Sequence, residues 1–154
     1  MIATYPNRHL AAAIPALIDS ARHSLAIAVY QLAPRTTTAH AAVAAIWRAL
    51  EAAPKRCVHC RIVIHAGAEN RNGAAAAMQA GKELKRIGWD VIVTDSGQIM
   101  HAKAAIIDGR RLLIGSHNWT ASALCANREL SVLIDDTATA DEAQAWFDNE
   151  WQRY

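Results

Sequence analysis

This sequence of 154 residues has few aromatic residues and no long apolar run. Aromatic residues make up 6% of the chain and hydrophobic residues 53%, largely as alanine, which favours helices packed through small side chains over a large aromatic core. No apolar run approaches the roughly 20 residues that a membrane span requires, so we expect no membrane anchor. No charged and then apolar leader precedes the first helix. We therefore expect a cytoplasmic protein, or a periplasmic or secreted one if a signal peptide has been removed.

Cysteine is also scarce, with three residues in the chain. Cys57 and Cys60, with His59 between them and His65 further on, look like a metal or redox site. However, no second ligand pair follows at zinc-finger spacing, and Cys125 is distant in sequence. Ordinary packing of small buried thiols is the favoured interpretation, with a disulfide open only for an exported protein.

The segment from His101 to Asn118 carries the chemistry of this chain. Its pattern is His-x-Lys-x4-Asp-x6-Gly-Ser-x-Asn, with the fixed residues His101, Lys103, Asp108, Gly115, Ser116 and Asn118. A phosphodiester is an anion that repels nucleophiles, so its cleavage requires neutralised charge, an unprotonated attacking group and an acid for the leaving oxygen. Lys103, Ser116 and Asn118 suit the first task. Imidazole suits the other two because its ordinary pKa is about 6.5, which makes His101 the candidate nucleophile.

Local sequence predicts that these residues lie together. If residues 101–107 form a strand, His101 and Lys103 point to the same face because side chains alternate with a period of two. The pair Asp108-Gly109 indicates a hairpin, and residues 111–114 read as its return strand. The hairpin brings the Gly115 segment back beside His101. At the turn, Asp108 is expected to form a structural hydrogen bond or ion pair.

This segment resembles the HKD signature of the phospholipase D superfamily, in which His-x-Lys-x4-Asp is followed by Gly-Ser-x-Asn. Asn127-Arg128-Glu129 is similar to the family's downstream Asn-x-Glu element, residues 24–30 to its first core strand, and residues 146–151 to its closing helix. The resemblance implies that Glu129 is catalytic and hydrogen-bonds the far nitrogen of the His101 ring. The closest type is the short bacterial endonuclease with one copy of the motif.

One copy of the motif is present. Lysine does not follow two residues after any of the other histidines, His9, His23, His40, His59, His65 and His117. The resemblance implies a homodimer in which two motifs face each other across a twofold axis. One His101 would form a phosphohistidine while the other protonates the leaving oxygen and then activates water. The motif has no carboxylate cluster at Mg²⁺ spacing, so we expect no metal and no other cofactor.

The charge of the chain is unevenly distributed. Residues 1–134 carry 15 lysines and arginines against 8 acidic residues, whereas residues 135–154 carry 1 against 6. A basic body suits a polyanion, so we expect nucleic acid, DNA or RNA, as the substrate. Any single cation is more often simply solvated. The candidate backbone contacts are Lys55, Arg56, Arg61, Arg71, Lys82, Lys85, Arg86, Arg110, Arg111 and Arg128.

Helical and strand patterns alternate along the chain. Helices are predicted at about residues 8–21, 38–53, 72–87 and 139–151, with a short turn near Ser122, and strands at residues 24–30, 61–64, 90–94, 103–107, 111–114 and 129–134. This order indicates an α/β fold, a mixed β-sheet sandwiched by helices, in one domain over residues 1–154. His65 ends a strand, at the position where ligands bind in open α/β sheets. Two roles are equally favoured for it, lining the cleft and packing. His117 is expected to be exposed or packed, and Trp119 to buttress its loop.

The sequence therefore predicts a metal-independent phosphodiesterase. The favoured type is an endonuclease with little sequence preference. Two alternatives stay open. A lipid phosphodiesterase or phosphatidyl transferase would need an apolar rim or an interfacial helix, and no strongly amphipathic exposed segment is evident. A catalytically silent nucleic-acid-binding module would not require the complete set of His101, Lys103, Ser116, Asn118 and Glu129.

Overall fold

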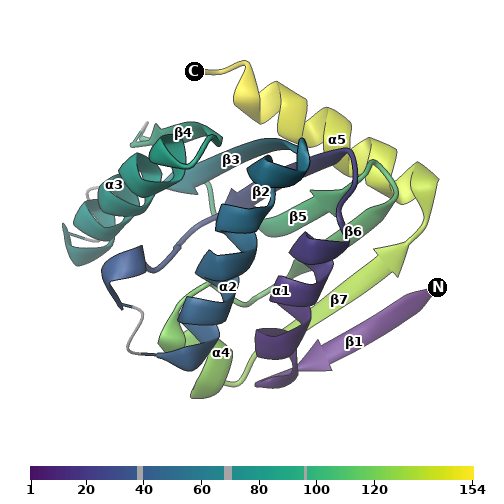
Figure 1. The fold of residues 1–154 in the computed structure, drawn as a ribbon, viewed down its shortest axis with the longest axis horizontal. Coiled ribbons are helices and arrows are strands. Elements are labelled where there is room, and N and C mark those ends of the chain that lie inside the picture. Colours follow the sequence, from purple (N-terminus) through teal and green to yellow (C-terminus); the bar gives the residue numbers. More distant parts are fainter. Residues whose placement is uncertain (38–39, 68–70, 96) are drawn as a thin grey trace.

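The computed structural model describes residues 1–37, 40–67, 71–95 and 97–154. In these residues, seven strands form one mixed sheet in the order β1-β7-β6-β5-β2-β3-β4 (Figure 1). The strands are β1 (Ile2–Pro6), β2 (Ser24–Val29), β3 (His59–His65), β4 (Asp90–Thr94), β5 (Lys103–Ile107), β6 (Arg111–Gly115) and β7 (Leu130–Asp135). The predicted α/β class with a mixed sheet is confirmed.

The strand directions place many segment ends at one edge of the sheet. Strands β2, β3 and β4 are parallel, whereas β2–β5, β5–β6, β6–β7 and β7–β1 are antiparallel pairs. Consequently the carboxyl ends of β1, β2, β3, β4 and β6 meet the amino ends of β5 and β7. We call this side of the sheet the site edge, because the predicted catalytic residues lie along it.

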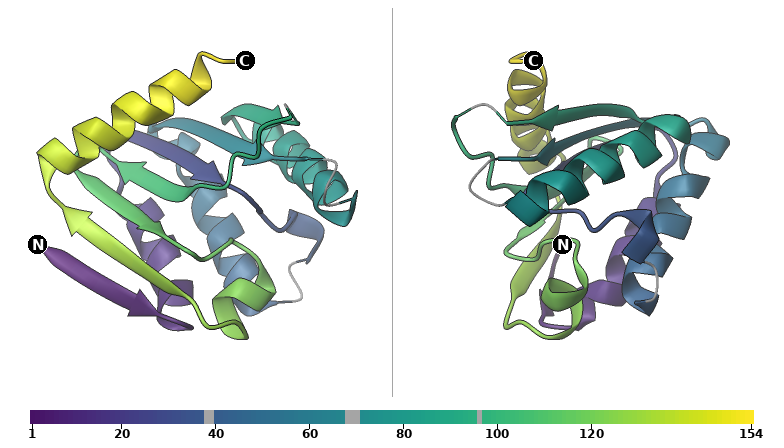
Figure 2. Two further views of the ribbon diagram at one scale, coloured as in Figure 1. Left: turned by 180° about the vertical axis from the view of Figure 1, so that it is seen from behind. Right: turned by 90° about the vertical axis from the view of Figure 1, so that its left-hand side faces the viewer.

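Helices cover both faces of the sheet. Helices α1 (His9–Ser20), α2 (Ala41–Ala52), α3 (Arg71–Arg86) and α4 (Ala121–Cys125) pack against one core on one face, and α5 (Thr137–Trp151) lies on the other (Figures 1 and 2). Two short 3₁₀ helices, η1 (Arg35–Thr37) and η2 (Pro54–Arg56), complete the first layer. The alternation of β2 separates the faces. Leu25, Ile27 and Val29 join the core beneath α1 and α2, whereas Ala26 and Ala28 join the core beneath α5.

The structure confirms most predicted elements and adds one. Strand β1 was not predicted, and it pairs with β7 at the far end of the chain, Ile2 opposite Ile134. Strand β3 runs from His59 to His65 and is longer than the predicted residues 61–64. Helix α1 continues through Pro15. The predicted start of the second helix at residues 38–39 lies outside the described residues, and α2 begins at Ala41.

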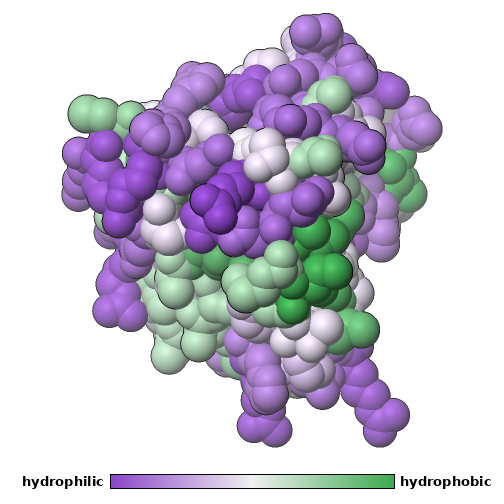
Figure 3. Space-filling view, turned by 90° about the vertical axis from the view of Figure 1, so that its right-hand side faces the viewer, coloured by the Kyte–Doolittle hydropathy of each residue, from purple (hydrophilic) through white to green (hydrophobic). Residues whose placement is uncertain are grey.

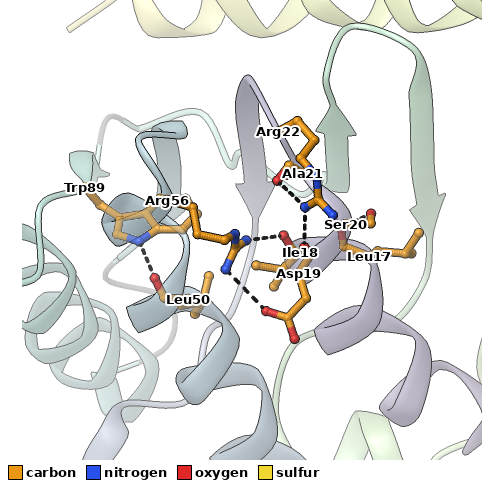
Figure 4. Close-up of polar contacts among 9 residues, drawn as sticks. All are labelled: Leu17, Ile18, Asp19, Ser20, Ala21, Arg22, Leu50, Arg56 and Trp89. Atoms are coloured by element: carbon orange, nitrogen blue, oxygen red, sulfur yellow. Dashed lines mark hydrogen bonds and ion pairs between the residues drawn. The ribbon is translucent and has the colours of Figure 1, made fainter.

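Side chains satisfy the carbonyl groups at the end of α1 (Figure 4). Arg56 donates from Nη2 to the carbonyl oxygen of Ile18 at 2.9 Å, and Arg22 donates to that of Asp19 at 3.0 Å. The last carbonyls of a helix have no partner within it, so these guanidinium groups replace water there. In the same region Trp89 Nε1 donates to the Leu50 carbonyl at 2.9 Å, which ties α2 to the start of β4. Arg56 thus lies at the edge opposite to the site edge.

The hairpin between β5 and β6 forms as predicted. Asp108 and Gly109 have φ values of 55° and 59°, a left-handed pair at the centre of the turn, which the Arg110 N–H closes by donating to the Ile107 carbonyl oxygen at 3.1 Å. The returning strand then approaches β7 very closely at Gly115. A Cβ on this glycine would lie 2.5 Å from the carbonyl oxygen of Leu130 and would also overlap Ser131. The absence of a side chain is therefore required for β6 to deliver Ser116 to the site edge.

Replacing Gly115 by alanine should destabilise the protein by about 2 kcal/mol, since the methyl group must displace backbone atoms of β7. The change is measured as a shift of the urea unfolding midpoint. Gly97→Ala is the matched control, because a Cβ there meets no atom within 4 Å. Equal midpoints for the two variants would contradict the close approach.

Candidate active site

The structure brings the predicted site residues from three strands to the site edge. His101 lies just before β5 and Lys103 is its first residue, Ser116 and Asn118 follow β6, and Glu129 precedes β7. The pairing of these strands thus brings the predicted site residues together. Lys103 is paired in register with Val29 of β2, and Gly115 with Ser131 of β7.

His101 and Lys103 are in direct contact. The Lys103 ammonium lies 3.2 Å from His101 Nδ1 and donates to the His101 carbonyl oxygen at 2.7 Å. Lys103 is 8% exposed, whereas the His101 side chain is exposed to solvent. A buried ammonium is costly unless its hydrogens are bonded, and these two acceptors supply that bonding. The other ring nitrogen, His101 Nε2, makes no hydrogen bond within the described residues.

Glu129 belongs to a separate hydrogen-bonded group. Its carboxylate accepts from the Ser116 hydroxyl and, at 3.1 Å, from Asn127 Nδ2. Its backbone N–H donates to Asn7 Oδ1 at 3.1 Å, and Ser116 Oγ accepts the Leu130 N–H at 3.1 Å. Among the described contacts of Glu129 there is none to His101, in contrast to the hydrogen bond that the family resemblance implied. The reason is geometric, because Lys103 occupies His101 Nδ1 and Ser116 holds the carboxylate.

The charges of the site influence one another. Desolvation lowers the pKa of His101, and the positive charges of Lys103 and His65 lower it further. Burial also lowers the pKa of Lys103, an effect that the Glu129 carboxylate opposes. Burial raises the pKa of Glu129, but the hydrogen bonds from Ser116 and Asn127 outweigh it, so the net pKa lies below the ordinary value. The site therefore combines a neutral imidazole, an ammonium and a carboxylate at neutral pH.

The loop after β6 is fixed by three further hydrogen bonds. Asn118 donates from Nδ2 to Gln31 Oε1 at 3.3 Å, which links it to the segment after β2. His117 points the other way and is 1% exposed, with Nδ1 2.8 Å from Ser131 Oγ and Nε2 2.7 Å from the Asn7 carbonyl oxygen. Since a carbonyl only accepts, Nε2 must carry a hydrogen. His117 is thus packed and not exposed.

Asp108 lies at the other end of β5, away from the site edge. Its carboxylate accepts the backbone N–H groups of Arg22, His23 and Ser24 at distances of 2.7–3.1 Å. Partial burial raises the pKa of Asp108, but these bonds together bring it below the ordinary value. This geometry joins the hairpin turn to the loop that enters β2, as a structural residue would.

Tyr30, immediately after β2, occupies the middle of the site and was not singled out from the sequence. Its ring is stacked on His65, with centroids 5.3 Å apart and planes at 20°, and lies 4.6 Å from the His101 ring. The Lys103 ammonium is 5.0 Å above its centroid. His65 is buried behind Tyr30 at 4% exposure. The signal that points to Tyr30 is its position at the carboxyl end of a parallel strand.

Two other groups of residues considered in the sequence lie apart from the site. Cys60 is buried and its pKa is raised to about 12 by desolvation, Cys57 is exposed, and His59 pairs with Asp90 at 3.4 Å. The basic residues are also dispersed. Arg56, Arg61 and Arg110 pair with Asp19, Asp148 and Asp135. The predicted set of backbone contacts is therefore not one patch, because the strand ends and helix ends that carry these residues lie at both edges of the sheet.

Two cavities adjoin the site, each of about 290 Å³. The first is polar and contains His101, and its other lining residues are Gln98, Ile99, Met100, Trp146, Glu150, Arg153 and Tyr154. The second is an apolar groove between α5 and the sheet, and the small side chains of Ala26, Ala28, Ala102 and Ala104 leave its space. Trp146 borders both cavities. In the described residues, no helix is both long and apolar enough to span a membrane, and no group of three metal-ligating side chains is found.

An exposed histidine beside a buried lysine, with a carboxylate before β7, thus lies at one edge of the sheet. Residues 14–151 match the family described as "Cardiolipin synthase, PLD-like domain". The chain belongs to this phospholipase D-like family, as the HKD resemblance predicted. A mitochondrial cardiolipin hydrolase from Xenopus laevis is 35% identical over 107 residues, which are 70% of this chain and 49% of that protein. The chain thus spans about half the length of this relative.

Solved structures show the same fold. Nuc from Salmonella typhimurium, a phospholipase D family member, superposes with a TM-score of 0.76 at 24% identity, covering 99% of this chain and 93% of that one. NucT from Helicobacter pylori superposes with a TM-score of 0.77 at 21% identity, covering 99% and 96%. The mixed sheet with its covering helices is therefore that of phospholipase D-like proteins.

The lowered pKa of His101 gives a pH prediction. Its imidazole should titrate below the ordinary value of 6.5, followed by NMR of the ring protons. Lys103→Met should raise this pKa because it removes a nearby positive charge, whereas Lys85→Met, on the exposed surface of α3, should leave it unchanged. With His101 as the predicted nucleophile, the neutral imidazole would be the attacking form, so the acid limb of kcat/KM should also lie below 6.5. A His101 pKa above that value would overturn the electrostatic picture of the site.

Proposed function

We propose that this protein is a metal-independent phosphodiesterase, and that it acts as an endonuclease with little sequence preference. The observation that carries the proposal is the convergence of His101, Lys103, Ser116, Asn118 and Glu129 at one sheet edge. The lowered pKa of His101 supports attack, because it keeps the imidazole neutral. Lys103 supplies the positive charge for the phosphate oxygens, and Ser116 and Asn118 supply neutral donors.

In the first step His101 Nε2 attacks phosphorus, forming a nitrogen–phosphorus bond as the bond to the leaving oxygen breaks. A phosphate oxygen competes with His101 Nδ1 for the Lys103 ammonium, which lies 3.2 Å from that nitrogen. Once the ammonium turns to phosphate, Nδ1 can carry the ring proton, which frees the lone pair on Nε2. Water then attacks the phosphohistidine, and the nitrogen–phosphorus bond breaks to restore His101.

The leaving oxygen and the attacking water need a second acid–base group. His65 is stacked behind Tyr30 at 4% exposure, and His117 is enclosed by Ser131 and Asn7, so neither is placed to reach a leaving group. A second copy of the chain supplies the missing group. His101 of the partner subunit would protonate the leaving oxygen and then accept a proton from water.

The surface around the site supports a homodimer. Of the eight large hydrophobic side chains exposed in the described residues, five surround the site edge: Ile99, Ile114, Leu130, Trp146 and Tyr154. Ile99, Trp146 and Tyr154 line the polar cavity with His101, and the other two adjoin Gly115 and Glu129. Figure 3 shows the opposite side of the molecule, where β1 begins, and apolar side chains gather between polar ones on that side as well. Apolar surface concentrated around a site is typical of a protein–protein interface.

A lipid phosphodiesterase or phosphatidyl transferase remains the second candidate, and the apolar groove beneath α5 is the observation that favours it. This groove meets the His101 cavity at Trp146, so a phosphate at His101 could carry a hydrocarbon chain into it. The name of the Xenopus relative, a cardiolipin hydrolase, is consistent with this alternative. A silent nucleic-acid-binding module is disfavoured, because binding alone does not require a neutral histidine beside a buried lysine.

The two substrate classes are separated by one assay. Purified protein is incubated in excess EDTA with plasmid, single-stranded DNA, RNA and phosphatidylcholine vesicles that contain cardiolipin, with His101→Asn as the inactive control. We expect nucleic acid cleavage that falls steeply with salt, because each phosphate contact releases counterions. Loss of activity in EDTA with rescue by Mg²⁺ would refute the mechanism. Cleavage of lipid alone, with a flat salt response, would establish the second candidate.

Site sharing is tested with mixed dimers. Differently tagged wild-type and His101→Asn subunits are co-expressed, and the heterodimer is isolated through both tags. We expect it to lack steady-state activity, because each composite site needs both His101 rings. A heterodimer with near half of the wild-type activity, or a fully active monomer, would contradict the shared site.

A further inference from the structure

The Tyr30 ring contacts the side chains of His101 and Lys103 and the buried His65. Its centroid lies 4.6 Å from the His101 ring, 5.3 Å from the His65 ring and 5.0 Å from Lys103 Nζ. The planes of Tyr30 and His65 are nearly parallel at 20°, whereas the His101 plane is tilted by 52°. The ring therefore has one aromatic neighbour behind it and the two charged or titrating groups of the site around it.

Hydrogen bonds fix the backbone on both sides of His101, at Met100 and Ala102. The Tyr30 N–H donates to the Ala102 carbonyl oxygen at 2.9 Å, which lies between His101 and Lys103. On the other side, His65 Nδ1 lies 3.4 Å from the Met100 N–H. The stacked pair of Tyr30 and His65 thus contacts the segment from Met100 to Lys103 through both backbone and side chains.

We propose that Tyr30 is a positioning residue of the phosphodiesterase site, whose ring fixes the orientation of the His101 imidazole and the Lys103 ammonium. This inference rests on the proposed function. The ring blocks one side of the His101 imidazole and thereby limits the rotamers from which Nε2 can attack. Its π face attracts the ammonium, which opposes the desolvation of Lys103. His65 supports the ring from behind and keeps it in place.

The ring, and not the side-chain volume, is the property that matters in this account. Tyr30→Phe keeps the ring, so kcat should stay within about threefold of wild type. Tyr30→Leu keeps an apolar side chain but loses the stacking and the cation–π contact, so kcat should fall by about 10-fold to 30-fold with little change in KM. His101 should also become more solvated in Tyr30→Leu, which moves its NMR-measured pKa up toward the ordinary value.

Phe147→Leu is the matched control, because Phe147 is a fully buried aromatic residue of α5 that is not among the residues of the site. It should lower the unfolding midpoint while leaving the His101 titration unchanged. If Tyr30→Phe lost as much activity as Tyr30→Leu, or if Tyr30→Leu left both kcat and the His101 titration unchanged, the positioning role would be wrong. The titration needs no substrate, so it tests the positioning even if the protein cleaved none of the phosphodiesters above.

Discussion

The antiparallel pairing of β2 with β5 is the constraint on which the site depends. It joins the parallel half of the sheet, β2, β3 and β4, to the antiparallel half, β5, β6, β7 and β1. Its register sets Val29 opposite Lys103 and continues into the hydrogen bond from Tyr30 to Ala102. A shift of one residue would turn Lys103 to the opposite face of the sheet, because side chains alternate along a strand. The register of the β2–β5 pair therefore determines the geometry of the site.

Burial of Lys103 shows how the fold stabilises a charge that the chemistry requires. An ammonium at 8% exposure loses most of its hydration, a loss that would normally favour the neutral form. Two acceptors on His101, the Tyr30 ring and the nearby negative charge of Glu129 oppose this tendency. Desolvation lowers the pKa of His101, and the positive charge of Lys103 lowers it further, so the buried lysine adds to what keeps the neighbouring imidazole neutral.

Local patterns explain why much of the site could be predicted. The His101 and Lys103 spacing, the Asp108-Gly109 turn and Gly115 are short-range features, and the structure places each of them as the sequence indicated. The hydrogen-bond partner of Glu129 differs from the one that the sequence indicated. That partner could not be predicted, because it depends on how the loops after β6 and before β7 meet. Strand β1 was missed for a related reason. Its pairing partner lies more than 100 residues away, and residues 2–6 carry little local signal.

Long-range arrangement also decided which residues do not belong to the site. The excess of basic residues in positions 1–134 suggested one binding surface, but Arg56 and Arg110 lie at the edge opposite to His101. Tyr30 shows the converse. Nothing in its local sequence separates it from the strand that it follows, and its contacts with His65, His101 and Lys103 arise only when β2 lies between β3 and β5.

Two displacements at phosphorus are the central claim of this account, and stereochemistry tests it most directly. A diester with a phosphorothioate of one configuration at the scissile position is cleaved in ¹⁸O-labelled water, and the configuration of the product is determined. Attack by His101 followed by attack by water inverts phosphorus twice, so the account predicts net retention. Net inversion would show that water attacks the diester directly, and would contradict a phosphohistidine at His101.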